Sequence, residues 1–338
     1  MLSDRDTLMR AMVLAAPRAA LTMQERPDPV PGAGEVRVGV SACGVCRTDL
    51  HVVDGELPDI RYPVVPGHEV VGRIDAVGED VTGLIPGTRV GVPWLGGTDG
   101  TCPYCRTGRE NLCDHPTFTG YQRDGGYAEY AAARVDFLLR IPESYADIHA
   151  APLLCAGLIG FRSLRLAVVE GLERPGRLGL YGFGSSAHII IQAALHLGHE
   201  VYVYTRGEAG RRLALQLGAV WAGGGDDAPP VELDSVIIFA PAGPLVPLAL
   251  RAVRRGGLVV CAGIHMSPIP SFDYDILWGE RILRSVANLT RADGHDFLAL
   301  APEVPIQTEV EVYPLEAARE ALVRMKAGEV VGTAVLVP

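Results

Sequence analysis

The chain of 338 residues carries 30 Lys and Arg against 40 Asp and Glu, which gives a formal net charge of −10. At roughly 150 residues per domain this length predicts two domains, and an acidic chain repels nucleic acid and anionic membranes, so we expect neither as a partner. The apolar content of 48% excludes a disordered chain, while no apolar run approaches the roughly 18 residues of a membrane helix.

The chain begins with MLSDRDTLMR, which carries acidic residues and has no apolar core. We therefore expect no signal peptide and a cytoplasmic protein. The first 150 residues contain short apolar runs, such as 35–40 and 70–77, separated by Gly and Pro signals that include Pro-Gly pairs at Pro31, Pro66 and Pro86. This spacing predicts a compact antiparallel, barrel-like unit.

Five of the seven cysteines fall between Cys43 and Cys113. In a cytoplasmic chain such clustering favours metal binding over disulfides. Zinc accepts thiolate and imidazole ligands, and two Cys with one His form a known catalytic set. Local spacing leaves other interpretations open, since Cys43 and Cys46 could be a redox pair or half of a metal site, and Cys155 a buried core residue.

Apolar segments typical of buried strands alternate with segments of helical spacing from residue 177 to about residue 287. The predicted strands span 178–181, 201–204, 235–239 and 258–261, and the predicted helices between them span 187–197, 209–217 and 245–253. This order predicts a doubly wound parallel sheet. The last fifty residues predict a helix at 315–326 and a short apolar end that could return to the first domain.

A glycine-rich loop follows the first of these strands. It reads G-x-G-x-x-A over Gly182, Gly184, Ser185, Ser186 and Ala187. Gly182 permits a tight turn, Gly184 lets the backbone approach a pyrophosphate, and Ala187 stands where a third Gly allows close helix packing. A plain strand-to-helix turn is the alternative, but the strand–loop–helix context favours dinucleotide binding.

The second strand of this series ends in Thr205 and Arg206, where an NAD-binding unit usually carries an acid. A hydroxyl and a guanidinium suit a ribose 2′-phosphate instead, and Arg211 adds positive charge. The sequence therefore predicts a preference for NADP, with a solvated loop of surface arginines as the alternative. Ala262 and Gly263 follow a predicted inner strand, where this fold places backbone near a nicotinamide.

The runs CGVCRTDLH at 43–51, PGHE at 66–69 and LLCAG at 153–157, the Cys cluster between them and the GFGSSA loop occur in one order. In this order they resemble the zinc-containing alcohol dehydrogenases of the medium-chain dehydrogenase/reductase superfamily. The resemblance covers essentially the whole chain. It implies an α/β protein with a GroES-like, β-rich catalytic domain at 1–156 and 287–338 and a Rossmann domain, with a doubly wound parallel sheet for the cofactor, at 157–286.

The resemblance implies the ligands of a catalytic zinc. Cys46, His68 and Cys155 match the three protein ligands, and Glu69 matches an acid that binds the metal in the resting site of some members. Cys43 does not match a ligand, and we interpret it as a packed neighbour.

The resemblance also assigns roles to three residues of the CGVCRTDLH run. Asp49 matches a carboxylate that orients the ligand histidine, and Thr48 matches the hydroxyl that touches the substrate oxygen. His51 matches the outer end of a proton relay, with an ordinary surface histidine as the alternative.

A second zinc of family members is held by four Cys in the pattern C-x2-C-x2-C-x7-C. Here Cys102, Cys105 and Cys113 match the last three positions, and Asp99 stands at the first. Because a carboxylate oxygen can bind zinc, a structural zinc held by one Asp and three Cys is feasible. A vestigial lobe with three free thiols is the alternative.

Together these features predict a zinc-dependent alcohol dehydrogenase or aldehyde reductase that transfers hydride reversibly between NADP(H) and a primary alcohol or aldehyde. By resemblance, Trp94, Leu57 and Tyr121 line the substrate pocket, where a large indole favours slim primary alcohols; a core Trp is the alternative. The resemblance also implies a homodimer or homotetramer.

Three alternatives compete with this function. The first is an NAD(H)-dependent alcohol or polyol dehydrogenase of the same family, which a comparison of cofactors separates. The others are a zinc-free quinone or enoyl reductase and a non-catalytic dinucleotide-binding protein. The complete set of Cys46, His68 and Cys155, together with Thr48 and His51, argues against both.

Overall fold

The computed structural model describes residues 7–168 and 176–338. The start of the chain, on which the expected absence of a signal peptide rests, therefore lies partly outside the described residues. The chain divides into two compact units. Unit 1 comprises Met1–Cys155, Asn288–Ala299 and Gln307–Pro338, and unit 2 comprises Ala156–Ala287 and Leu300–Ile306.

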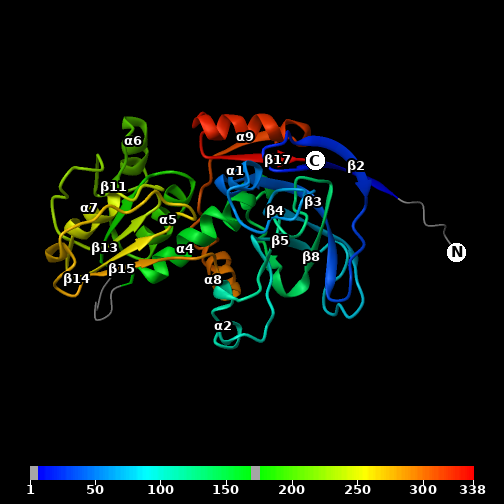
Figure 1. Ribbon diagram of the computed structural model, residues 1–338, viewed down its shortest axis with the longest axis horizontal. Helices are drawn as coiled ribbons and strands as arrows, with labels where there is room; N and C mark the ends of the chain where they lie inside the picture. The colour runs from blue at the N-terminus through cyan, green and yellow to red at the C-terminus, as the bar shows by residue number, and fades with distance from the viewer. Residues whose placement is uncertain (1–6, 169–175) are drawn as a thin grey trace. The chain divides into compact units, whose positions relative to one another are not determined.

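Unit 1 is built on a mainly antiparallel sheet (Figure 1) with the strand order β16-β17-β3-β4-β5-β9, in which β8 also pairs with β3. Its strands are β3 (Glu35–Val45), β4 (Glu69–Val77), β5 (Arg89–Val92), β8 (Tyr130–Arg134), β9 (Leu139–Arg140), β16 (Val310–Pro314) and β17 (Thr333–Val337). Two further two-stranded sheets pair β1 (Leu8–Val13) with β2 (Thr22–Pro27) and β6 (Leu95–Gly97) with β7 (Thr117–Phe118).

The sequence of β3 explains its central place in this sheet. In its first half the side chains alternate, and Val36 and Val38 are fully buried, as expected for a strand with one face on the core. Its last four residues, from Ala42 to Val45, are buried on both faces. This strand ends one residue before Cys46, so a rigid element carries the CGVC run.

The end of the chain returns to this strand. β17 pairs antiparallel with β3, with Ala334 opposite Val45 and Leu336 opposite Cys43. The helix predicted at 315–326 is α9 (Ala318–Ala327), preceded by a single 3-10 turn at Leu315–Ala317. α9 runs beside β17 in Figure 1. The apolar end of the chain thus completes the sheet of unit 1.

The remaining short elements of unit 1 are helical. The α-helices are α1 (Arg47–Asp54), α2 (Pro103–Arg106), α3 (Asp147–Ala150) and α8 (Arg291–Leu300), whose last residue belongs to unit 2. The 3-10 turns are η1 (Glu110–Leu112), η2 (Val135–Phe137), η3 (Ala151–Leu154) and η5 (Leu315–Ala317).

Unit 2 contains a parallel six-stranded sheet with the order β12-β11-β10-β13-β14-β15. Its strands are β10 (Arg177–Tyr181), β11 (Glu200–Tyr204), β12 (Trp221–Gly223), β13 (Leu233–Ile238), β14 (Val253–Cys261) and β15 (Ile282–Ser285). Its helices are α4 (Ala156–Leu166), α5 (Ser185–His196), α6 (Glu208–Gln216), α7 (Leu245–Ala252) and the 3-10 turn η4 (Tyr274–Ile276). The doubly wound parallel sheet predicted from the sequence is confirmed.

Four elements of unit 2 differ from the prediction, namely the two edge strands, the helix α4 and the start of β14. The edge strands β12 and β15 and the helix α4 were not predicted, because each edge strand is short and α4 begins inside the Cys155 segment. β14 begins at Val253, directly after α7 and well before the predicted start at 258. A register shift opposite Leu233 lets the polar Arg254–Arg255 pair join this strand. Among the described residues no helix is both long and apolar enough to cross a membrane.

Candidate active site and metal centres

Cys46 stands at the junction of β3 and α1. It is the N-cap of α1, with extended backbone angles (φ −114°, ψ 160°), and Asp49 closes a capping box with it. The Oδ2 atom of Asp49 accepts a hydrogen bond of 2.8 Å from the Cys46 backbone N–H. Such a box satisfies donors that a helix start otherwise leaves free. The thiol of Cys46 is therefore held at a fixed helix terminus.

Four candidate ligands converge beside this terminus. The ligand atoms of Cys46, His68, Glu69 and Cys155 all lie within 4.8 Å of one another. The two Sγ atoms are 3.7 Å apart. His68 is completely buried, and its Nε2 atom has no hydrogen-bond partner among the described residues. Two thiols and an imidazole nitrogen at such short separations are one of the donor sets that zinc uses in catalytic sites.

A single carboxylate orients this cluster. Asp49 is completely buried, and its Oδ1 atom lies 3.1 Å from Nδ1 of His68 and accepts a 3.3 Å hydrogen bond from the Gly67 N–H. Its Oδ2 atom accepts from the Cys46 N–H and from the Tyr127 hydroxyl, at 2.8 and 3.1 Å. A carboxylate behind a ligand histidine fixes the ring tautomer and leaves Nε2 to the metal.

Glu69 reaches the cluster through a space that a glycine provides. A side chain at Gly44, which lies opposite Glu69 in the β3–β4 ladder, would overlap with the Glu69 carboxyl group. The Oε2 atom of Glu69 is buried and has no hydrogen-bond partner among the described residues. Burial raises the pKa of Glu69 well above its usual range, and the Cys46 thiolate raises it further. The carboxyl group is thus available to a cation at this point.

Close packing changes the protonation of the ligands. The hydrogen bond from Cys155 lowers the pKa of Cys46 well below its usual value. The same hydrogen bond, followed by burial, raises the pKa of Cys155. Burial alone would lower the pKa of His68, but the neighbouring Asp49 raises it well above its usual value. The pKa values of the two cysteines are thus moved in opposite directions, and a dication bound by both would favour the thiolate form of each.

Thr48 and His51 lie one helical turn apart on α1, so they share a face of that helix. Thr48 is buried, and its Oγ1 atom lies 3.7 Å from the Cys46 Sγ atom. His51 is partly exposed, and its Nδ1 atom lies 2.6 Å from Oε2 of Glu56. One face of α1 thus runs from a hydroxyl at the metal cluster to an imidazole that reaches solvent.

An aromatic cluster covers the candidate ligand His68. The Trp94 ring meets the His68 ring edge to face, with centroids 4.8 Å apart. Phe118 stacks on Trp94 at 5.0 Å, and Tyr121 packs against it at 5.6 Å. Leu57 is partly buried against the same core. The structure brings together the predicted pair Trp94 and Tyr121, and it adds Phe118, which no local pattern in the sequence marked.

The second predicted metal set also converges. The ligand atoms of Asp99, Cys102, Cys105 and Cys113 lie within 4.8 Å of one another. The Sγ atoms accept backbone N–H groups, as thiolates around a metal do: Cys105 N–H donates to Cys102 and Asp99 N–H donates to Cys113, at 3.5 and 3.4 Å. Three thiols and a carboxylate are a feasible tetrahedral zinc set.

Asp99 also has a structural role in the lobe between β6 and β7, which carries this second set. Its Oδ1 atom accepts the N–H groups of Cys102 and Thr101, at 2.9 and 2.8 Å. These hydrogen bonds hold the pKa of Asp99 well below its usual range. Burial raises the pKa of Cys105 to about 12. The carboxylate thus builds the turn with one oxygen and leaves the other for the thiols or a cation.

The lobe is tied to α8 by a buried acid. Oε1 of Glu110 accepts hydrogen bonds from the backbone N–H and the Nε–H of Arg291, at 3.0 and 3.2 Å. Arg291 begins α8 and also covers the Phe137 ring. An acid at a helix N-terminus meets the positive end of the helix dipole. Burial raises the pKa of Glu110, but the hydrogen bonds from Arg291 outweigh it and lower that pKa.

The predicted dinucleotide loop joins β10 to α5 in unit 2. Gly182 has φ 91°, and a side chain there would lie 2.8 Å from the Ala240 backbone nitrogen, at the end of β13. Gly184 is the N-cap of α5, and a side chain there would meet nothing. Ala187 is completely buried. Since the strand order reverses between β10 and β13, the loop lies at the switch point of the sheet, where such folds bind ligands.

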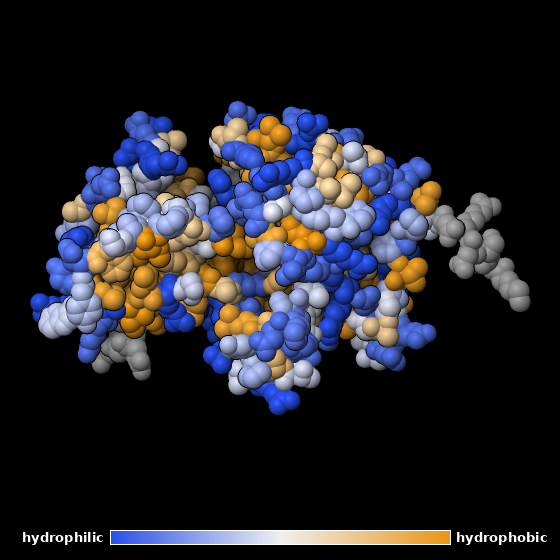
Figure 2. Space-filling model, in the orientation of Figure 1, coloured by the Kyte–Doolittle hydropathy of each residue, from blue (hydrophilic) through white to orange (hydrophobic). Residues whose placement is uncertain are grey.

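Thr205 and Arg206 follow β11, as predicted, and Arg206 is exposed. The surface over α6 is largely blue in Figure 2. Arg212 on this helix forms an ion pair with Glu208 at 3.0 Å. For Arg206 and Arg211 the described residues provide no carboxylate partner, so these two guanidinium groups remain available to an anion. Ala262 and Gly263 directly follow β14.

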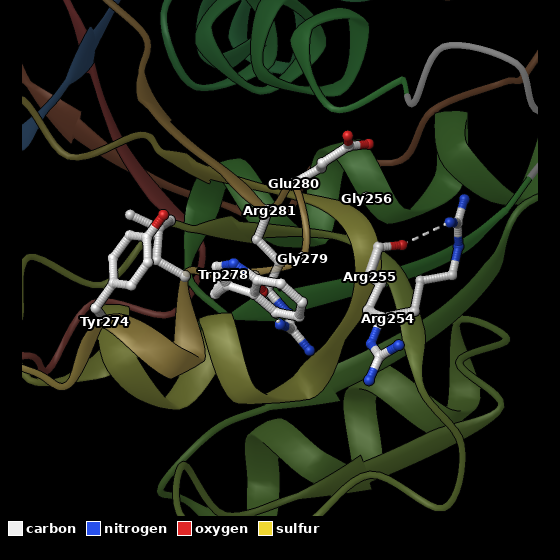
Figure 3. Close-up of a pocket in the computed structure, with 9 residues that line it drawn as sticks. Arg254, Arg255, Gly256, Tyr274, Trp278, Gly279, Glu280 and Arg281 are labelled. Carbon is white, nitrogen blue, oxygen red and sulfur yellow. Dashed lines mark hydrogen bonds between the residues drawn. The ribbon is translucent and has the colours of Figure 1, made fainter.

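A separate pocket of about 850 Å³ lies on unit 2 (Figure 3). It is lined by Arg255, Tyr274, Trp278 and Arg281, and Arg254 donates a 2.8 Å hydrogen bond to the Arg255 carbonyl oxygen at its wall. None of the predicted metal, catalytic or cofactor residues lines this pocket.

Residues 32–143 match the alcohol dehydrogenase GroES-like domain family. The chain is 49% identical over 314 residues to the probable alcohol dehydrogenase AdhA of Mycobacterium tuberculosis (strain CDC 1551 / Oshkosh), covering 91% of this chain and 90% of that protein. Among solved structures it resembles a cinnamyl alcohol dehydrogenase of Sorghum bicolor, with TM-score 0.87, 29% identity and coverage of 98% and 97%. An acetophenone reductase of Geotrichum candidum, solved in complex with NAD, gives TM-score 0.86, 28% identity and coverage of 98% and 97%.

Proposed function

The chain belongs to the zinc-type alcohol dehydrogenases of the medium-chain dehydrogenase/reductase superfamily, and we propose that it transfers hydride reversibly between NADP(H) and a primary alcohol or aldehyde at a zinc site. The observation that carries this proposal is the convergence of Cys46, His68 and Cys155 around the unpartnered Nε2 atom of a completely buried imidazole. Leaving such an atom without a partner costs about 1–3 kcal/mol, which a metal at that point would offset.

The residues present fit a zinc ion in both geometry and donor type. Cys46, His68 and Cys155 would hold it, and Glu69 is close enough to replace one of its other ligands. When bound, zinc supplies a Lewis acid that lowers the pKa of an alcohol or polarises a carbonyl, and NADP(H) supplies the hydride chemistry. The role of the protein's own residues is to hold these groups in place and to exclude water from the site.

Thr48 and His51 handle the proton in this proposal. Thr48 would hold the alcohol proton at Oγ1, since its hydroxyl is buried beside Cys46. His51, on the same face of α1, would exchange the proton with solvent through its partly exposed ring. Glu56, 2.6 Å from Nδ1, orients this ring.

The shape of the apolar wall supports small or slim substrates. Trp94 is fixed between His68, Phe118 and Tyr121 by ring contacts, so its indole cannot swing aside without breaking three contacts. A rigid indole next to a ligand histidine limits the width of a bound alcohol. We therefore propose primary alcohols and their aldehydes, linear or aromatic, over bulky secondary alcohols.

We propose a second, structural zinc at Asp99, Cys102, Cys105 and Cys113. The proposed preference for NADP rests on Thr205 and Arg206 directly after β11, because neither of these two residues is the acid that usually binds a ribose hydroxyl. From the family we further propose a homodimer or homotetramer in the cytoplasm. Sedimentation equilibrium of the purified protein measures the first of these, and fractionation of cells that express the chain measures the second.

The experiment that tests the function compares initial rates of NADPH and NADH oxidation with linear and aromatic aldehydes. It uses protein of measured zinc content, before and after removal of the metal and after zinc is restored. We expect NADPH turnover that disappears with the metal and returns with it. Faster turnover with NADH would overturn the cofactor assignment alone. Turnover that persists without metal would overturn the zinc chemistry.

A further inference from the structure

Tyr127 lies in the segment before β8 and is completely buried. Its hydroxyl donates a 3.1 Å hydrogen bond to the Oδ2 atom of Asp49. The remaining donors to Asp49 are Cys46 N–H, Gly67 N–H and the His68 ring. Within the described residues, no Lys or Arg forms an ion pair with Asp49. The carboxylate behind the candidate metal ligands is thus held by hydrogen bonds alone, and Tyr127 supplies the only hydroxyl among them.

The backbone fixes the Tyr127 ring against the segment that carries His68. The Tyr127 N–H donates to the Pro66 carbonyl oxygen at 3.0 Å, and its carbonyl oxygen accepts from the Met12 N–H at 2.8 Å. Gly67 lies next to the ring, with φ 98°, and a side chain there would overlap with the Tyr127 ring. The position of the hydroxyl is therefore set before any metal binds.

We propose that Tyr127 is a positioning residue for the catalytic metal, which acts through Asp49 on the His68 ring and on the Cys46 backbone. The inference rests on the zinc site of the proposed function. The Asp49 carboxylate touches one ligand through each oxygen, and Tyr127 hydrogen-bonds the same oxygen as the Cys46 N–H. Removing the hydroxyl leaves that oxygen with a single donor and lets the carboxylate rotate, which misdirects His68 Nε2. Outer partners of metal ligands change metal affinity by roughly 10- to 100-fold.

The test compares Tyr127→Phe with Tyr62→Phe. The Tyr62 hydroxyl donates a 3.1 Å hydrogen bond to the Val52 carbonyl oxygen on the same helix α1, so the control loses an equivalent hydroxyl but not one that reaches Asp49. Zinc release into excess chelator is followed with time, and the Cys46→Ser variant identifies the phase that belongs to the catalytic site. Cobalt is then exchanged into each protein, and its visible ligand-field bands are recorded.

We expect Tyr127→Phe to bind the same amount of zinc, to release it from the catalytic site roughly 10-fold faster and to shift the cobalt bands. Tyr62→Phe should match the unaltered protein in both measurements. Equal release and unchanged bands in Tyr127→Phe would overturn the proposal. If instead the unaltered protein and Cys46→Ser hold equal amounts of zinc, the zinc site of the proposed function itself fails.

A second substitution keeps the test informative if Tyr127→Phe does not fold. Incorporation of 3-fluorotyrosine at position 127 keeps the ring and the hydroxyl and strengthens the O–H donor. Zinc release that is slower than in the unaltered protein, together with displaced cobalt bands, supports the proposal. Identical release and bands with and without fluorine overturn it.

Discussion

Cys43 and Cys46 are separated by only two residues, yet their thiols have different surroundings. Cys43 is completely buried in β3, where its Sγ atom donates to the Gly44 carbonyl oxygen at 3.6 Å, and burial raises its pKa well above the usual value. Cys46 faces Cys155 from the start of α1, and the hydrogen bond from Cys155 lowers its pKa. Since the thiolate is the form of cysteine that binds metals, these surroundings favour Cys46 over Cys43 as a metal ligand.

Replacing these two cysteines in turn tests that selection. Cys46→Ser should lose one zinc per chain and at least about 1,000-fold in kcat/KM, since the remaining His68 and Cys155 leave the metal with two strong ligands. Cys43→Ser should keep its zinc and most of its activity. Zinc content by mass spectrometry and aldehyde reduction are measured on both variants. Loss of zinc from Cys43→Ser but not from Cys46→Ser would reverse the ligand assignment.

Replacing Arg206 tests the proposed preference for NADPH over NADH. Arg206 is exposed directly after β11 and has no carboxylate partner in the described part of the chain, so it can bind a phosphate through charge-assisted hydrogen bonds, worth about 1.5–3 kcal/mol. Arg206→Ala should therefore lower kcat/KM for NADPH by about 10- to 100-fold and change that for NADH less than about 2-fold. Arg212→Ala, which removes an arginine already paired with Glu208, is the control. Equal losses for both cofactors in Arg206→Ala would contradict a phosphate contact.

Sequence reasoning at the residue scale identified the candidate ligands but missed the residues that support them. Cys46, His68 and Cys155 were identified through the resemblance, and the structure brings them together. Phe118, Gly44 and Tyr127 act only through contacts between segments far apart in the chain. A single tyrosine or glycine has no local pattern that reveals such a contact, so no periodicity could have marked them.

Among the elements, the metal lobe between β6 and β7 depends on one unusual residue. Oδ1 of Asp99 accepts two backbone N–H groups of the turn, whereas its negative charge would serve the metal. Replacing Asp99 by Asn therefore distinguishes its role in the turn from its role as a metal ligand. Asp99→Asn keeps an acceptor for the turn and removes the negative charge, so we expect the second zinc to bind about 10-fold or more weakly. Asp99→Cys should bind it more tightly. Asp114→Asn, at an exposed neighbour of Cys113, should change nothing.

Zinc affinity of the second site, measured by competition with a chelator, decides this prediction. Equal affinity in the Asp99→Asn variant and the unaltered protein would show that three thiols suffice, and that Asp99 serves the turn alone.

The contact of this lobe with α8 predicts a pH dependence. The pKa of Glu110 is lowered in the folded protein by the hydrogen bonds from Arg291, so its contribution is present above the unfolded pKa of about 4.3 and is lost as the pH falls through the folded pKa. Glu110→Gln should lower the free energy of unfolding by about 1.5 kcal/mol at pH 7. The difference in stability between this variant and the unaltered protein should shrink below about pH 4.3. Glu143→Gln, at an exposed acid, is the control.

Thermal unfolding of both variants and the unaltered protein between pH 7 and about pH 3, a range that extends below the unfolded pKa, measures the Glu110 effect. A Tm difference that stays constant over this range would mean that Glu110→Gln acts through shape rather than through charge.

Element prediction succeeded where a local pattern repeats. The inner strands β10, β11 and β13 of unit 2 and the helices α5, α6 and α7 were predicted close to their bounds, because buried strands and helices alternate regularly there; for β14 only the end was predicted correctly. The family resemblance and the mixed α/β fold class are both confirmed. The short strands β12 and β15 were missed, since three or four residues at the edge of a sheet carry no detectable period.

At the scale of the whole molecule, residues from both ends of the chain build the unit that holds the metal candidates. β16 and β17 come from the last thirty residues, while β3 and β4 come from the first eighty. The sequence indicated an apolar end that could return, but pairing over some 290 residues follows no local rule. The partner of a terminal strand is decided by the whole sheet, which a sequence pattern does not show.

This pairing makes the last strand a support of the metal site. β17 places Leu336 opposite Cys43 and Ala334 opposite Val45, the residue before Cys46. Removing residues 333–338 would expose the backbone and the buried side chains of β3 at that point, so unit 1 should lose stability and release the zinc bound at Cys46 and His68. The sheet of unit 2 contains no residue of this segment, so binding of NADPH, followed by its fluorescence, should persist. Removal of Pro338 alone, which lies beyond β17, is the control. A truncated chain that keeps its zinc and its Tm would show that β3 holds Cys46 without β17.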